Sequence, residues 1–356
     1  MIIIRPVRKM DIDDILSLST HTGGGLTSLP HDRETLEKRI IRSKDTWLEL
    51  LEPDSQGYVF VMEDLSISKV VGICAIEVAV GLREPWYSYR ITQEVHASKA
   101  LDVYRSLSTL VLSNDHTGFS ELCTLFLSPE YRKGVLGRLL SKSRFLFIAS
   151  NRKRFPKDII AELRGYSNKY GHSPFWEHVG KHFFAMDFEK VDFLSGTGQK
   201  AFIAELMPKH PLYVDFLPAE AKSIIGQVHP ETAPARKMLE GEGLKFKNYI
   251  DIFDGGPTLQ SKIDKVYSIK NSRLFDWQSD DDIPLYDYNT PANTFPTNET
   301  KYRLYLVSNE QLSVECYKVT VSFAYIDDSN KLNLPVRVID ALNLKVGEPV
   351  RAVLLK

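Results

Sequence analysis

The sequence predicts an α/β fold with α+β character, and three observations lead to this conclusion. Apolar residues at helix-like and strand-like spacings alternate up to about residue 190, in the order β-α-α-β-β-β-α-β-α-β. The composition, 43% hydrophobic and 26% charged over 356 residues, is that of a globular protein long enough for two domains. Beyond residue 301 the pattern is that of strands and turns alone.

The elements of the first half follow from these spacings. Asp13 and Asp14 fall in the first turn of the first helix, where they complement the helix dipole, and Leu36 and Ile40 are at helical spacing in the second. Residues 81–118 are rich in aromatic side chains and are predicted to be a long irregular excursion, which is often functional. In chain order we predict a strand at 2–8, helices from 11 and at 32–47, strands at 57–63, 70–80 and 120–127, a helix at 135–150, a strand at 158–163, a short helix at 173–180 and a strand at 183–188.

The second half is predicted to begin with a weak repeat. The strand–helix–strand unit of 158–188 recurs at 223–254, as a strand at 223–228, a helix at 233–240 and a strand at 245–254. Residues 270–300, rich in Asp, Asn, Thr and Pro, indicate a linker, and strands follow at 302–307, 316–323 and 350–355. We therefore predict three parts: 1–190, 191–265 as a partial second repeat, and 266–356 as a linker and a small C-terminal β domain.

Charge and cysteine usage exclude several classes of function. The net charge of −1 gives no overall attraction to nucleic acid or to a membrane surface, and no window approaches the roughly 18 apolar residues of a membrane span. Cys74, Cys123 and Cys316 are sparse and form no CxxC pair, which points to a reducing compartment, and we expect a cytoplasmic protein. No His, Cys or Asp cluster has metal-ligand spacing, so no metal is expected.

One loop has the chemistry of a phosphate cradle. Arg132-Lys133-Gly134-Val135-Leu136-Gly137 joins the strand at 120–127 to the helix at 135–150, whose unpaired N–H groups would face an anion. This arrangement resembles the acyl-CoA N-acyltransferase (GNAT) fold, in which the loop reads Arg/Gln-x-x-Gly-x-Gly/Ala. Arg132 and Gly137 are in place, whereas Val135 stands where the first glycine is expected. The resemblance implies a GNAT-like fold with Arg132 and Gly137 at the CoA phosphates.

Longer segments of the sequence point to one family. The segments are Thr22–Pro30, Gly72–Gly81, Leu112–Gly118, Ser120–Leu127, Leu140–Phe145, Gly196–Pro211, Gly226–Pro230, Thr232–Arg236 and Asn248–Thr258. With them the chain resembles the bacterial arginine N-succinyltransferases over residues 1 to about 260. The resemblance implies that succinyl-CoA and L-arginine react to N2-succinyl-L-arginine and CoA, the first step of a succinyl-transfer route of arginine catabolism. It implies no cofactor beyond succinyl-CoA as co-substrate, and a homodimer or higher oligomer.

Two further site residues come from this resemblance. His229 matches the family's proton donor, and an imidazole titrating near neutral pH can deliver a proton to a leaving sulfur. Leu125 matches a leucine implied in succinyl-CoA binding, and a backbone contact explains how an apolar residue would serve. The general base stays open among Glu77, Glu121, His116, His96 and a water chain.

Two glycine-containing segments, Cys123 and several alternative functions complete the sequence predictions. The segment 22–28 either lines the acceptor site or is a flexible connector, and Gly196–Lys200 lacks the spacing of a nucleotide loop. Cys123 is expected to pack in the core and not to accept the acyl group, because direct attack by the amine needs no such intermediate. The alternatives to arginine succinylation are another acceptor such as ornithine, another acyl donor, and a non-catalytic subunit of a hetero-oligomer, which Val135 alone favours.

Overall fold

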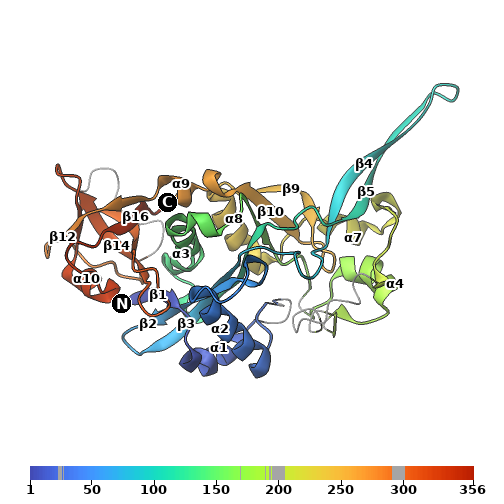
Figure 1. Ribbon diagram of the computed structural model, residues 1–356. Coiled ribbons are helices and arrows are strands. Elements are labelled where there is room, and N and C mark those ends of the chain that lie inside the picture. The colour runs from blue at the N-terminus through green and yellow to red at the C-terminus, as the bar shows by residue number, and fades with distance from the viewer. Residues whose placement is uncertain are drawn as a thin grey trace.

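A single large sheet runs the length of the molecule (Figure 1). The computed structural model describes residues 1–22, 26, 28–168, 170–188, 190–191, 194, 205–290 and 301–356. Neighbouring strands are antiparallel except for β6 and β7 and the short pair β12 and β15. Along the sheet the strands are β11 (Arg273–Phe275), β16 (Val350–Leu354), β13 (Arg303–Asn309), β14 (Val319–Ile326), β1 (Ile2–Pro6), β2 (Gly57–Asp64), β3 (Lys69–Glu77), β6 (Ser120–Leu127), β7 (Asp158–Glu162), β10 (Pro257–Lys262), β9 (Lys245–Ile250), β4 (Ser88–Ser98), β5 (Val103–Ser113) and β8 (Leu212–Tyr213), while β12 (Trp277–Ser279) pairs with β15 (Leu332–Leu334).

Helices cover both faces of the central strands. Helices α1 (Ile12–Ser19) and α2 (Arg33–Trp47) lie on one face and α3 (Leu136–Ser150) on the other, as Figure 1 shows. The alternation of side chains along β2 explains this layering: Val59 and Val61 pack with the α1 and α2 residues, whereas Phe60 packs with those of α3.

Most predicted elements of the first half are confirmed, with boundaries within a few residues. The strand predicted at 183–188 is wrong, because Lys181–Phe184 forms α4, which continues the π-helical turn Trp176–Gly180. The strand predicted at 223–228 is also wrong, because α7 (Ala219–Ile224) occupies it and ends before Gly226, which has φ +71°. A short apolar run does not distinguish helix from strand, and here burial of Phe184 against Trp176 is achieved by a helix.

The strand–helix–strand repeat therefore does not recur in the predicted form. The helix and strand of its second copy are confirmed as α8 (Ala233–Gly241) and β9, but the first strand is missing. Strand β10, which the sequence pattern did not reveal, pairs with β7 and brings the second half of the chain beside the first.

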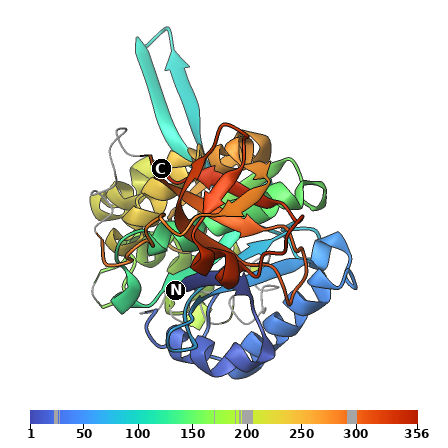
Figure 2. The same ribbon diagram turned by 90° about the vertical axis from the view of Figure 1, so that its left-hand side faces the viewer.

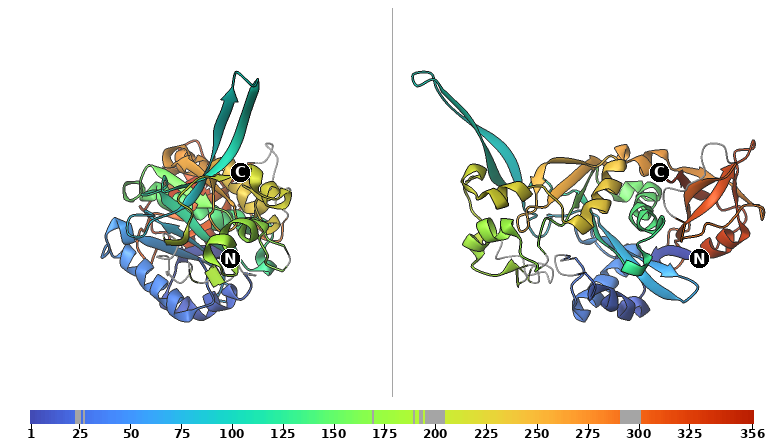
Figure 3. Two further views of the ribbon diagram at one scale, coloured as in Figure 1. Left: turned by 90° about the vertical axis from the view of Figure 1, so that its right-hand side faces the viewer. Right: turned by 180° about the vertical axis from the view of Figure 1, so that it is seen from behind.

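The prediction of an irregular excursion at 81–118 is wrong for its central part, because residues 88–113 form a regular hairpin. Strands β4 and β5 pair over their full length, and the outer part of this hairpin arm projects from the body in every view (Figures 2 and 3). Only the base of the arm joins the sheet, where Tyr89 and Arg90 pair with β9 and Thr109 and Leu110 with β8. The arm was missed because neither face of its outer part is buried, so no apolar alternation marks it.

The C-terminal part continues the main sheet. Strand β14 pairs with β1 at Val319 and Ile4, and β13 and β16 follow in order. The short strands β11 and β12 fall inside the predicted linker, and the helices α9 (Tyr267–Asn271) and α10 (Val336–Leu342) were not predicted. The division at residues 190 and 265 stays a prediction.

Candidate active site

A β-bulge in β6 is the starting point of the site. Ile73 of β3 pairs with Phe126 and Ala75 with Cys123, so that Cys74 faces two residues, Thr124 and Leu125. Thr124 adopts φ +53°, a conformation that costs energy for a residue branched at Cβ. Bulges bend a strand and leave the extra residue outside the ladder, and they are frequent next to active sites.

Strands β6 and β7 separate beyond this region. Their parallel ladder contains only the pairs Ser120 with Ile159 and Glu121 with Ile160, and the remaining residues of β6 have no pairing on β7. A cavity of about 1560 Å³ opens here, with Leu125 in its wall. Residues 122–127 of β6 therefore have no partner on β7, and the backbone contact at Leu125 that the family resemblance implies stays a prediction.

The loop before α3 forms one end of the cavity. Arg132 and Gly137 both line it, and a Cβ atom built on Gly137 meets no atom within 4 Å. Gly134 has φ +53° and lies against the carbonyl oxygen of Tyr288, so the residue that needs glycine stands one position before the expected one. Val135 is fully buried in the core with φ −106°. Val135 therefore packs into the core and is not among the residues that line the cavity.

Arg132 gives this loop a positive charge and also stabilises its conformation. Its Nε donates a hydrogen bond to the carbonyl oxygen of Leu127 at 3.0 Å, and its guanidinium lies 5.4 Å from the centre of the Phe126 ring. These contacts fix the guanidinium beside the N-terminus of α3, where the helix dipole also favours an anion.

His229 is positioned by three segments that meet beside the same cavity. The N–H of His229 donates to the carbonyl oxygen of Arg164 at 2.9 Å, and Val228 bridges to Gly165. The carboxylate of Asp254 accepts the N–H groups of Gly165 and Gly256 at 2.6 and 2.8 Å. Burial, followed by the charge of Asp251, raises the pKa of Asp254 well above its ordinary value.

The His229 ring has a defined proton position. Its Nδ1 accepts the N–H of Glu231 at 3.3 Å, which favours a neutral ring with the proton on Nε2. Burial, and next the nearby charge of Arg164, lower the pKa of His229. Arg164, Glu231 and Thr232 line the cavity, whereas His229 itself does not and lies beside them. Of the four predicted site residues, Leu125, Arg132 and Gly137 line the cavity, and the role of each stays a prediction.

The four candidate bases separate by position. Glu77 and Glu121 line the cavity, whereas His116 and His96 do not. His116 is buried between Ser88 and Gln260, with ring nitrogens 3.3 and 3.2 Å from their side-chain oxygens. His96 lies exposed on the hairpin arm.

The remaining segments and the cysteine considered in the sequence differ in their relation to the cavity. Thr22, Leu26 and Ser28 line the cavity, whereas 196–200 lie outside the described residues. Burial raises the pKa of the Cys123 thiol to about 12, which disfavours the nucleophilic thiolate. Within the described ranges, no group of His, Cys, Asp and Glu is arranged to hold a metal ion, and no helix is long and apolar enough to span a membrane.

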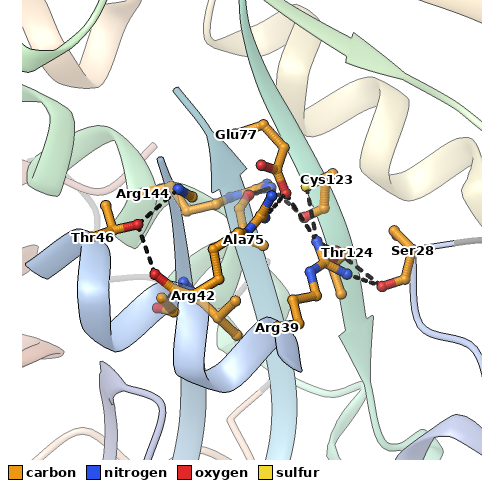
Figure 4. A network of polar contacts seen from close by, with 12 residues as sticks. Ser28, Arg39, Arg42, Thr46, Ala75, Glu77, Cys123, Thr124 and Arg144 are labelled. Atoms are coloured by element: carbon orange, nitrogen blue, oxygen red, sulfur yellow. Dashed lines mark hydrogen bonds and ion pairs between the residues drawn. The ribbon is translucent and has the colours of Figure 1, made fainter. Parts of the chain in front are cut away.

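Sequence reasoning missed a group of arginines around the bulge (Figure 4). Arg144 is 1% exposed, and its Nη1 donates to the carbonyl oxygens of Ala75 and Cys123 at 3.3 and 3.2 Å, which holds the two strands where the bulge begins. Arg144 shares the buried face of α3 with Leu140 and Phe147. An arginine at an apolar position of a helical pattern was the available signal.

Comparison with known proteins places this geometry in a family. The family model described as arginine N-succinyltransferase beta subunit matches residues 2–268. Relatives named arginine N-succinyltransferase, from Yersinia pseudotuberculosis and Shigella sonnei, are each 52% identical, over 355 and 356 residues, covering 100% of this chain and 98% of each relative.

A solved structure shows the same fold. The arginine/ornithine succinyltransferase subunit AI from Pseudomonas aeruginosa matches with a TM-score of 0.86 and 32% identity, covering 99% of this chain and 98% of that one. The predicted GNAT-like α/β fold is confirmed. The chain belongs to the arginine N-succinyltransferase family, whose members are acyl-CoA-dependent N-acyltransferases.

Proposed function

We propose that the chain transfers the succinyl group of succinyl-CoA to the α-amine of L-arginine, giving N2-succinyl-L-arginine and CoA. The observation that carries this proposal is the single cavity into which the bulge of β6, the N-terminus of α3 and the surroundings of His229 all open. Identity of 52% over the full chain to relatives named for this activity supports the choice of substrates.

Each part of the cavity has a role in the proposed reaction. The pyrophosphate of CoA lies at Arg132 and Gly137, and the thioester carbonyl lies against the backbone at Leu125. The unprotonated amine attacks the carbonyl carbon, the carbon–sulfur bond breaks, and His229 supplies the proton that the departing thiolate takes up. The proton that the amine nitrogen loses goes to a general base, for which Glu77, Glu121 or a water chain stays open. The reaction needs succinyl-CoA as co-substrate and no resident cofactor or metal.

The test is direct. Purified protein mixed with succinyl-CoA and arginine is expected to release free thiol and an equal amount of N2-succinyl-arginine, measured by thiol titration and mass spectrometry. A folded protein that produces neither result refutes the proposal. Thiol release without succinyl-arginine would instead indicate hydrolysis of succinyl-CoA.

Ornithine is a second candidate acceptor, because the Pseudomonas aeruginosa structure is named for arginine and ornithine. The two amino acids share the reacting α-amine but differ in the length and charge distribution of the side chain. The ratio of kcat/KM for arginine to that for ornithine decides between them.

The proposed setting is a cytoplasmic oligomer of this chain. The hairpin arm supports an oligomer, since a two-stranded ribbon is marginally stable without further packing and Leu101 and Tyr104 on the arm are 75% and 70% exposed. Replacing the outer arm, residues 94–107, by a short turn is expected to lower the mass found by light scattering. An unchanged mass would show that the arm does not hold the oligomer together.

A further inference from the structure

Two arginines of α2 lie beside the bulge of β6 and line the same cavity (Figure 4). Arg39 and Arg42 lie on one face of the helix, and both reach the carboxylate oxygen Oε1 of Glu77, at 3.5 and 2.5 Å. The Nη2 group of Arg39 also donates to the Thr124 hydroxyl at 2.7 Å. Arg39 donates a further hydrogen bond to the carbonyl oxygen of Ser28.

This group carries an excess of positive charge. Two guanidinium ions share one carboxylate, because within the described residues no carboxylate other than Glu77 pairs with Arg39 or Arg42. The Arg39 and Glu77 side chains are largely shielded from water, with exposures of 16% and 20%, while Arg42 is 36% exposed and lines the cavity. Shielding a charge from water costs free energy unless an opposite charge approaches it. The arrangement therefore favours an anion in the cavity.

Donors remain available for such an anion. In the described part of the chain the Nε and Nη1 groups of Arg42 have no hydrogen-bond acceptor, while its Nη2 is held by Glu77. A planar guanidinium held on one side and open on the other suits the two oxygens of a carboxylate.

The proximity of the arginines to Leu125 indicates which carboxylate of the substrates they would bind. Thr124, which holds Arg39, is the neighbour of Leu125, where the thioester carbonyl is proposed to lie. In a succinyl group only two methylene groups separate the thioester carbonyl from the free carboxylate. The free carboxylate of a donor held at Leu125 is thus within reach of the arginines of α2, because Arg39 is bound to Thr124, the residue next to Leu125 on β6.

We propose that Arg39 and Arg42 bind the free carboxylate of the succinyl group and so select this donor over uncharged acyl-CoA molecules. The inference rests on the proposed function and adds the residues that determine donor specificity. Glu77 keeps the two guanidinium groups together, which explains why a carboxylate that lines the cavity serves as their partner and not as the general base.

Binding measurements test the proposal without relying on turnover. In calorimetric titrations Arg42→Gln is expected to weaken succinyl-CoA binding by about 10- to 100-fold, the loss of a charge-assisted hydrogen-bonded pair. The same variant is expected to bind butyryl-CoA, in which a methyl group replaces the carboxylate, within about threefold of the unsubstituted protein. Arg33→Gln, on the same helix but paired with Asp13 away from the cavity, is the control and should change neither affinity.

Three results would overturn the inference. Equal weakening for succinyl-CoA and butyryl-CoA would show a structural role of Arg42, and unchanged succinyl-CoA binding would show no role in donor recognition. The third is a loss of arginine affinity that is absent with L-argininamide, which would assign the site to the acceptor carboxylate. Binding of succinyl-CoA by a protein that transfers nothing to arginine would refute the proposed function and leave this inference standing.

Discussion

The two ends of the cavity are built in different ways. At the loop before α3 the predicted phosphate contacts are backbone N–H groups, and the loop needs a left-handed residue at Gly134 and has open space at Gly137. At the other end the predicted proton donor is one side chain, His229, whose position depends on contacts with Arg164 and on the buried Asp254 behind it.

Because of this difference, we expect the two ends to tolerate amino-acid substitutions differently. A backbone site survives a displaced glycine, since Val135 packs into the core and the helix N-terminus keeps its geometry. A side-chain site held by a network does not survive loss of its reacting group, and it responds to changes in residues that touch no ligand. Substitutions at the two ends should therefore differ in what they impair.

His229→Ala should have the largest effect on the rate. Removal of a proton donor typically lowers kcat by about 10²–10⁴-fold, while succinyl-CoA affinity should stay nearly unchanged because His229 does not line the cavity. Single-turnover kinetics and calorimetry measure the two quantities. His182→Ala, an exposed histidine on α4, is the control. A loss of affinity with an unchanged kcat would assign His229 to binding.

Gly137→Val should impair binding and leave the fold intact. A Cβ atom at this position meets no atom within 4 Å, so we expect the valine side chain to fit and to occupy the space next to the helix N–H groups. We expect CoA affinity to fall by about 10- to 100-fold, or about 1.4–2.7 kcal/mol. Gly134→Ala is the contrast: its Cβ would lie 2.7 Å from the oxygen of Tyr288, so it should lower the thermal unfolding midpoint. Unchanged CoA affinity in Gly137→Val would show that the phosphates of CoA do not bind at this loop.

The sequence predicted the backbone end better than the side-chain end. The loop 132–137 is continuous in the chain, and local patterns predict a strand, a loop and a helix in that order. The surroundings of His229 join segments near residues 164, 228 and 254, and no local pattern shows that they meet. Resemblance to a family supplied His229 and Leu125, which chemistry alone did not distinguish.

The wrong strands and the missed arm have the same cause. Apolar periodicity predicts an element only where one face is buried against a neighbour, and it fails for short apolar runs such as 183–188 and for strands without a buried face such as the outer arm. The arginines of α2 were missed for a related reason. Their partners Glu77 and Thr124 lie on two other elements of the sheet.

Asp254→Asn should change how stability depends on pH. The pKa of Asp254 is raised in the folded state, so the folded protein binds a proton more tightly than the unfolded chain, and this stabilisation is lost as pH rises through the folded-state pKa. An amide oxygen can replace only one of the two accepted hydrogen bonds, which should cost about 1–3 kcal/mol at a pH below the folded-state pKa. The gap between the two proteins in urea unfolding should narrow as pH rises through that pKa. A gap that widens would contradict the raised pKa.

Arg164→Gln should have the smallest effect, a displacement of the pH profile. The charge of Arg164 lowers the pKa of His229, while the backbone carbonyl that positions His229 is unaffected by the substitution. If the protonated ring is the donor, the single-turnover rate falls as pH rises through this pKa, and removing the charge should move that fall to higher pH. Arg152→Gln, which removes a surface arginine paired with Asp264, should leave the profile in place.

The outcome for Arg164→Gln sharpens the assignment of the proton. A profile that moves upward identifies His229 as the titrating donor at the side-chain end of the cavity. A profile that stays where it was would show that the rate does not depend on a protonated His229. In that case the neutral ring, with its proton on Nε2 because Nδ1 accepts the N–H of Glu231, would act as a hydrogen-bond donor to the reacting group, and His229→Ala would still slow the reaction.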